Sequence, residues 1–92
     1  MAHDLPTRVE RVPDALFQEM EGETVFLEMA SGEYYGIDDV GSRMWQALED
    51  TENVESAVQR LLGEYRVEES VLRRDLAELI EKMRAAGLVT VS

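Results

Sequence analysis

The feature that most constrains the fold is a strand that turns into a helix without a spacer, within residues 31–48. Residues 33–37 (EYYGI) are strand formers, and they follow the turn signal Ser31-Gly32. A helix is predicted from about Asp39, and its apolar residues recur at helical spacing: Val40, Met44, Ala47 and Leu48. Gly41 in its first turn suggests that the start of the helix lies close to a strand.

Two further strands are predicted before this one, at residues 15–20 and 24–29. The connections at residues 21–23 and 30–32 are so short that the three strands should form an antiparallel meander. Helices follow the strand at 33–37, so we expect that strand to lie at an edge with one row of backbone groups unpaired.

Three helices are predicted after the strands, at residues 39–49, 54–65 and 68–86, followed by a short extended tail. Three strands are only marginally stable alone, so one face of the sheet should pack against the helices. For that face we expect the side chains Val25, Leu27, Met29, Tyr35 and Ile37. The fold class is α+β, with a single domain over residues 1–92 and a loose segment over residues 1–13.

Composition excludes several functions. The 92 residues carry a formal net charge of −11 and no cysteine. This charge opposes binding to nucleic acid and to anionic membranes, and without cysteine there is neither a disulfide nor a thiolate metal site. Neither a signal peptide nor a membrane-spanning run is recognisable, so a cytoplasmic location is expected.

Catalytic patterns are weak. The adjacent pairs Asp38-Asp39 and Glu68-Glu69 could act as paired carboxylates, but both fit better as residues that stabilise helix N-termini. The serines have no histidine base nearby, since the only histidine is His3 in the N-terminal segment. The sequence therefore predicts no enzyme, no cofactor and no metal ion.

The second and third helices are joined by a short turn and resemble a helix-turn-helix, and a sheet beside such a unit resembles a winged helix. DNA binding is therefore an alternative function. The charges oppose it, because residues 68–84 contain five acidic and four basic side chains in a chain that is acidic overall.

The spaced residues of the central stretch resemble the PqqD-like proteins, also known as RiPP recognition elements: Gly32, Tyr34, Tyr35, Ile37, Asp38, Gly41, Met44, Trp45 and Leu48. Two later patterns are similar to the second and third helices of the same family, within residues 54–67 and 72–88. Met44 and Asp38 are mild departures, since a β-branched residue and Asn are more usual there.

The resemblance implies a binding module without catalytic activity. Family members bind the leader segment of a ribosomally made precursor peptide, as a strand added to the third strand in a groove with the third helix. The implied peptide-binding residues are Glu33, Tyr34, Tyr35, Gly36 and Ile37 on the strand and Val71, Leu72, Asp75, Leu76 and Leu79 on the helix. Leu76 and Leu79 fit a core role equally well.

The implied partners are a precursor leader peptide and a maturation enzyme. The leader peptidase of lasso peptide biosynthesis is favoured for that enzyme, and the alternative is a chaperone that presents its precursor to the radical SAM enzyme of pyrroloquinoline quinone biosynthesis. The chain is expected to be a monomer or a weak dimer, since an unpaired strand allows pairing between copies.

Overall fold

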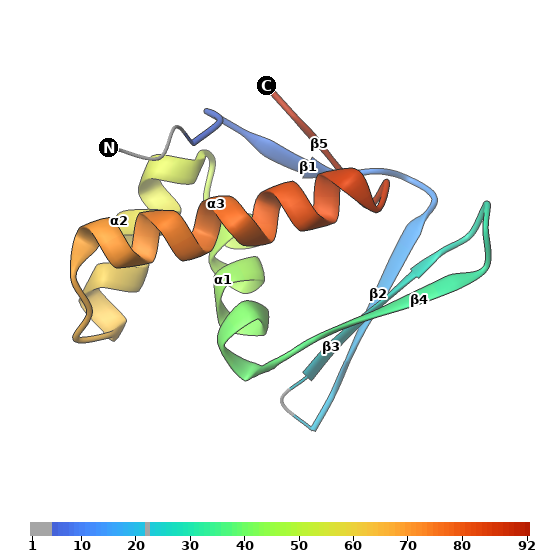
Figure 1. Cartoon of the computed structure of the whole chain (residues 1–92), viewed down its shortest axis with the longest axis horizontal. Helices are drawn as coiled ribbons and strands as arrows, with labels where there is room; N and C mark the ends of the chain where they lie inside the picture. The colour runs from blue at the N-terminus through green and yellow to red at the C-terminus, as the bar shows by residue number, and fades with distance from the viewer. Residues whose placement is uncertain (1–4, 22) are drawn as a thin grey trace.

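The computed structural model describes residues 5–21 and 23–92, as an α+β fold in two blocks (Figure 1). Strands β2 (Ala15–Met20), β3 (Glu23–Glu28) and β4 (Glu33–Ile37) form an antiparallel sheet in the order β2-β3-β4. Helices α1 (Asp39–Asp50), α2 (Val54–Glu64) and α3 (Glu69–Ala85) form the other block. The predicted elements are confirmed to within a few residues at each end.

Two short strands lie outside the meander: β5 (Val89–Val91) falls in the predicted extended tail, whereas β1 (Val9–Arg11) and its pairing with β5 were not predicted. β1 pairs antiparallel with β5, and Thr7 N and Arg8 N both donate to Ser92 O. The prediction of a loose segment over residues 1–13 is therefore wrong for residues 7–12, because the C-terminal tail accepts hydrogen bonds from their backbone and donates hydrogen bonds to it. Residues 1–4, which include His3, lie outside the described residues.

The inner face of the sheet packs on α1 through aromatic side chains. Phe26 and Trp45 are almost fully buried, and their ring centroids lie 5.2 Å apart at 78°. Phe17 also meets both rings, at 5.9 Å from Phe26 and 6.1 Å from Trp45. Register places Phe17, Phe26 and Tyr35 opposite one another, so these three residues form one row of the inner face.

The predicted inner face of the middle strand is wrong. Thr24 and Phe26 of β3 are buried, whereas Val25 and Leu27 lie on the outer face and Met29 is 55% exposed. The prediction for β4 holds, since Tyr35 and Ile37 face the helices. Each face of the middle strand carries apolar residues, so the sequence pattern alone does not decide which face is buried. The face with Phe26 is buried because Phe26 packs against Trp45.

The helices enclose the rest of the core. Leu61 of α2 and Leu76 of α3 are fully buried, and Leu88 closes the core just before β5. Asn53 caps α2, accepting a hydrogen bond from Ser56 N at 2.8 Å. Among residues 5–21 and 23–92, no helix is long and apolar enough to cross a bilayer.

Candidate functional site

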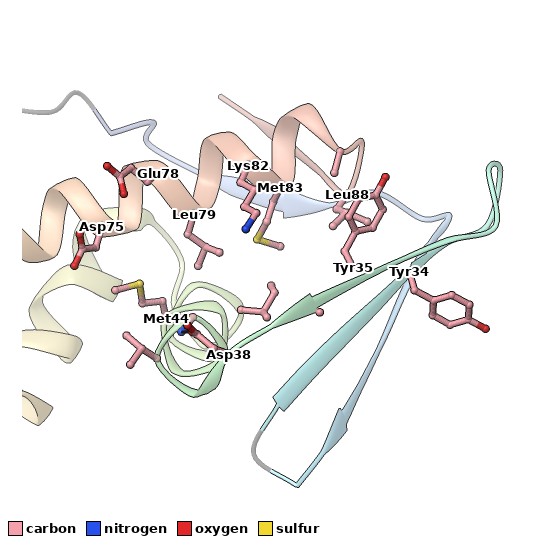
Figure 2. A pocket seen from close by; sticks show the side chains of 15 residues that line it. Tyr34, Tyr35, Asp38, Met44, Asp75, Glu78, Leu79, Lys82, Met83 and Leu88 are labelled. Atoms are coloured by element: carbon pink, nitrogen blue, oxygen red, sulfur yellow. Dashed lines mark hydrogen bonds between the residues drawn. The ribbon is translucent and has the colours of Figure 1, made fainter.

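A groove of about 660 Å³ lies between β4 and α3, with the start of α1 as its floor (Figure 2). One side is formed by the residues of β4 and the other by the residues of α3. The lining residues are Tyr34, Tyr35, Gly36, Ile37, Asp38, Val40, Gly41, Met44, Asp75, Glu78, Leu79, Lys82, Met83, Ala86 and Leu88. The groove therefore runs along the edge strand of the sheet.

The free edge of β4 presents backbone groups of two residues. Along an antiparallel ladder, successive residues direct their N–H and C=O groups to opposite sides. Just after β3, Met29 N donates to Asp14 O, just before β2, at 2.9 Å. The N–H of Met29 therefore points toward β2, and the groups of Thr24, Phe26 and Glu28 point toward β4. Because Phe26 pairs with Tyr35, the neighbours of Tyr35 on β4, Tyr34 and Gly36, direct their N–H and C=O groups away from β3.

The end of β4 is fixed to α1 by side chains at the junction. Ser42 Oγ accepts from Thr24 N at 2.9 Å and donates to Ile37 O at 3.3 Å, so one buried hydroxyl bridges the last pair of the β3–β4 ladder. Asp38 caps α1, accepting from Gly41 N at 2.8 Å.

Gly41 permits the close approach of the strand to the helix. A Cβ atom at this position would lie 2.3 Å from Ile37 Cγ2. Glycine in the first turn of a helix costs about 1 kcal/mol relative to alanine, and here the contact with the strand explains it. The junction therefore sets the position of the edge relative to the helices.

The wall formed by α3 follows helical spacing. Asp75, Glu78, Leu79, Lys82 and Met83 recur every three or four residues and so share one face. Met83 is buried, Leu79 is half-buried, and the charged groups lie at the rim. The groove thus has an apolar bottom and a polar border, as peptide and ligand sites commonly do.

The structure brings six of the ten predicted residues to the groove: Tyr34, Tyr35, Gly36, Ile37, Asp75 and Leu79. The side chain of Tyr34 points away from the groove, onto the outer face of the sheet (Figure 2). A core role and a groove role were both open for Leu76 and Leu79. Leu79 lines the groove, whereas Leu76 is fully buried in the core. Val71 does not line the groove, and Leu72 lines a smaller cavity. Glu33 begins β4 beside the groove, where its carboxylate accepts a hydrogen bond from Tyr35 Oη at 2.6 Å.

Sequence reasoning missed part of the groove because it placed the α3 wall one to two turns too near the N-terminus. The missed lining residues are Asp38, Val40, Gly41, Met44, Glu78, Lys82, Met83, Ala86 and Leu88. Continuing the face of Asp75 by the helical period would have found Glu78, Lys82 and Met83.

A second cavity of about 180 Å³ adjoins the groove at the N-terminal end of α3. It shares Val40, Met44 and Asp75 with the groove and reaches the buried side chains Leu61 and Leu72. Its other lining residues are Tyr65, Arg66 and Val67. The two cavities therefore lie next to each other along the start of α1.

Electrostatics at the groove are dominated by carboxylates. Asp38, Asp75 and Glu78 border it, and Lys82 is its one lining cation among the described residues. The hydrogen bond to the Glu33 carboxylate, with a smaller contribution from burial, raises the pKa of Tyr35. Within the described part of the chain, no three His, Asp or Glu side chains converge to hold a metal ion.

Comparison with known proteins identifies the family of the chain. The family model described as coenzyme PQQ synthesis protein D (PqqD) matches residues 23–89. The comparison with curated proteins found no match.

Two similar structures contain leader peptides. One is TbiB1 in complex with the TbiA(beta) leader peptide, at 29% identity and a TM-score of 0.81, covering 87% of this chain and 93% of that one. The other is lasso peptide synthetase B1 complexed with the leader peptide, at 26% identity and a TM-score of 0.81, covering 90% of this chain and 98% of that one. Since the family model spans most of the chain and the whole fold is shared, the protein belongs to the PqqD family, as a PqqD-like RiPP recognition element.

Proposed function

We propose that the protein binds the leader segment of a ribosomally synthesised precursor peptide, as a strand added to β4. The observation that carries the proposal is a free strand edge lying along a groove. Tyr34 and Gly36 offer outward N–H and C=O groups, and the groove offers space for alternate side chains of the added strand. Main-chain bonds would supply affinity that depends little on sequence, and the groove would supply specificity.

The fixed geometry of β4 favours this function. The Ser42 bridge and the Asp38 cap hold the strand before any peptide binds, so the conformational cost of binding falls mainly on the leader. The two similar chains, which share the fold over most of their length, each form a complex with a leader peptide. That likeness supports the same class of ligand here.

Delivery to a maturation enzyme is the second part of the proposal, with the leader peptidase of a lasso peptide pathway favoured. The outer face of the sheet offers a surface for it. Leu16, Leu27 and Tyr34 form a cross-strand row on this face, with Leu16 48% and Tyr34 72% exposed. A leader strand on β4 would extend this face, so an enzyme docked there would contact protein and leader together.

Leader binding can be tested directly by fluorescence anisotropy. The probe is a labelled leader of the precursor encoded beside the gene for this chain, and the control is a labelled DNA duplex at about 150 mM salt. We expect the leader to bind at micromolar Kd or better, about −8 kcal/mol, and the duplex not to bind. Salt-sensitive DNA binding without leader binding would reverse the assignment.

The genes that neighbour the gene for this chain discriminate between the two pathways. A neighbouring cysteine-protease gene supports the lasso pathway, whereas a neighbouring radical SAM enzyme gene supports the pyrroloquinoline quinone alternative. We propose a non-catalytic role in either case. Mass spectrometry of the precursor incubated with the purified chain should find it unchanged, and cleavage that persists through repurification would contradict this role.

A further inference from the structure

Lys82 differs from the other basic residues of α3. Arg73, Arg74 and Arg84 each form an ion pair with a carboxylate, at 2.6, 3.3 and 2.5 Å. Lys82 forms no ion pair within the part of the chain that the structure describes, although Glu78 lies one turn away. Figure 2 shows its side chain between Leu79 and Met83, with the nitrogen directed into the groove.

The charges along the groove are arranged with a polarity. Asp38 and Asp75 border the end where β4 runs into α1, and Glu78 lies on the next turn of α3. Lys82 lies one turn further along α3, toward the end lined by Tyr34 and Leu88 (Figure 2). An acidic peptide side chain is repelled at the first end and attracted at Lys82.

We propose that Lys82 is a specificity-determining residue that binds an acidic side chain of the leader, and that this contact fixes the register of the leader on β4. The inference rests on the proposed function and names the kind of leader that the groove takes. Lys82 is a point charge on a flexible stem with three donors, so it can follow a carboxylate on an extended strand.

The spacing of Asp75 and Lys82 along α3 predicts where a second recognised residue lies in the leader. Asp75 and Lys82 lie seven residues apart on α3, which is about 10 Å along the helix axis. An extended peptide covers about 10 Å in roughly three residues, and only alternate side chains face α3. The acidic residue of the leader should therefore lie two or four positions from a basic or hydroxyl residue that faces Asp75.

The test uses a random library of 14-residue peptides displayed on phage, selected against the full chain and three variants. Lys82→Glu reverses the charge in the groove. Arg84→Glu is the matched control, because it makes the same charge change two residues along α3, where Arg84 pairs with Glu81. Gly36→Pro removes an outward donor of β4 and reports whether the selected peptides use the strand edge.

We expect the wild type and Arg84→Glu to enrich Asp or Glu at one position, and Lys82→Glu to enrich Lys or Arg there. Anisotropy should show that Lys82→Glu weakens the best wild-type peptide about tenfold or more, and that exchanging its acidic residue for Lys restores binding to within about threefold. If Lys82→Glu does not fold, Lys82→Met should weaken the same peptide about threefold and lose the acidic preference.

Two results would overturn the inference and are distinguishable. If peptides lose binding with Gly36→Pro but show the same preferences with Lys82→Glu, Lys82 does not read charge while the proposed strand addition stands. If no selected peptide loses binding with Gly36→Pro, leader binding at β4 fails and the role of Lys82 fails with it.

Discussion

Gly36→Pro is the sharpest test of strand addition, because it changes one backbone donor at the free edge. The N–H of Gly36 points away from β3, so its loss leaves the β3–β4 ladder intact. An added Cβ at this position meets nothing within 4 Å, so the folded chain has room for a side chain to begin there. Proline is tolerated on edge strands where the missing N–H faces solvent, so the variant should fold.

The expected loss follows from the hydrogen bond that the leader can no longer make. A carbonyl of the bound leader would face the proline ring without a partner, which costs about 1–3 kcal/mol, or about 5-fold to 150-fold in Kd. Gly36→Ala is the matched control, because it adds a side chain and keeps the N–H. Tyr35→Pro is the opposite control, because its N–H points into the ladder with Phe26, and its loss should lower the melting temperature.

Isothermal titration calorimetry with the leader peptide measures the Kd of each variant, and circular dichroism with thermal melting reports folding. Strand addition requires Gly36→Pro to bind weakly while melting near the wild type, and Gly36→Ala to bind as the wild type does. A folded Gly36→Pro protein that binds the leader with unchanged Kd would refute strand addition at this edge.

Three further variants test the supports of the site. Ser42→Ala leaves the buried Thr24 N–H without its acceptor and should lower the free energy of unfolding by about 1–3 kcal/mol in urea titrations. Gly41→Ala gains about 1 kcal/mol of helix propensity but forces Cβ to 2.3 Å from Ile37 Cγ2, so urea titration should find net destabilisation, and calorimetry weaker leader binding. Arg73 lowers the pKa of Glu55 below its ordinary 4.5, chiefly by hydrogen bonding. Arg73→Met should therefore destabilise the chain at pH 7, and unfolding titrations should show this difference shrinking as the pH falls below 4.5.

Local signals were sufficient for the three-stranded sheet and the three helices. The strand β4 and the start of α1 follow from strand formers, a turn signal and an aspartate cap, all within residues 31–42. The pairing of β1 with β5 has no such signal. It joins residues about eighty positions apart, and the charged residues at Arg8, Glu10 and Arg11 give the segment no apolar pattern.

The orientation of β3 shows a limit of counting apolar residues. Val25, Leu27 and Met29 outnumber Phe26 in the alternating pattern, yet Phe26 is the buried residue. The deciding contact is with Trp45, which follows from tertiary packing rather than from the strand. The same kind of information was needed to place the groove along the second half of α3, since α1 determines where β4 meets that helix.

The edge of β4 cannot by itself select a peptide. Its outward N–H and C=O groups are hydrated in the free chain, so each bond to a leader replaces a bond to water and contributes only about 1 kcal/mol. Any extended peptide can make the same bonds. In the proposed complex, discrimination would therefore come from the side chains that line the groove, where Leu79 and Met83 offer apolar contact and the carboxylates and Lys82 offer charge. A rigid strand junction keeps these groups in register with the backbone edge, so a shift of one residue in the leader would turn its recognition side chains away from α3.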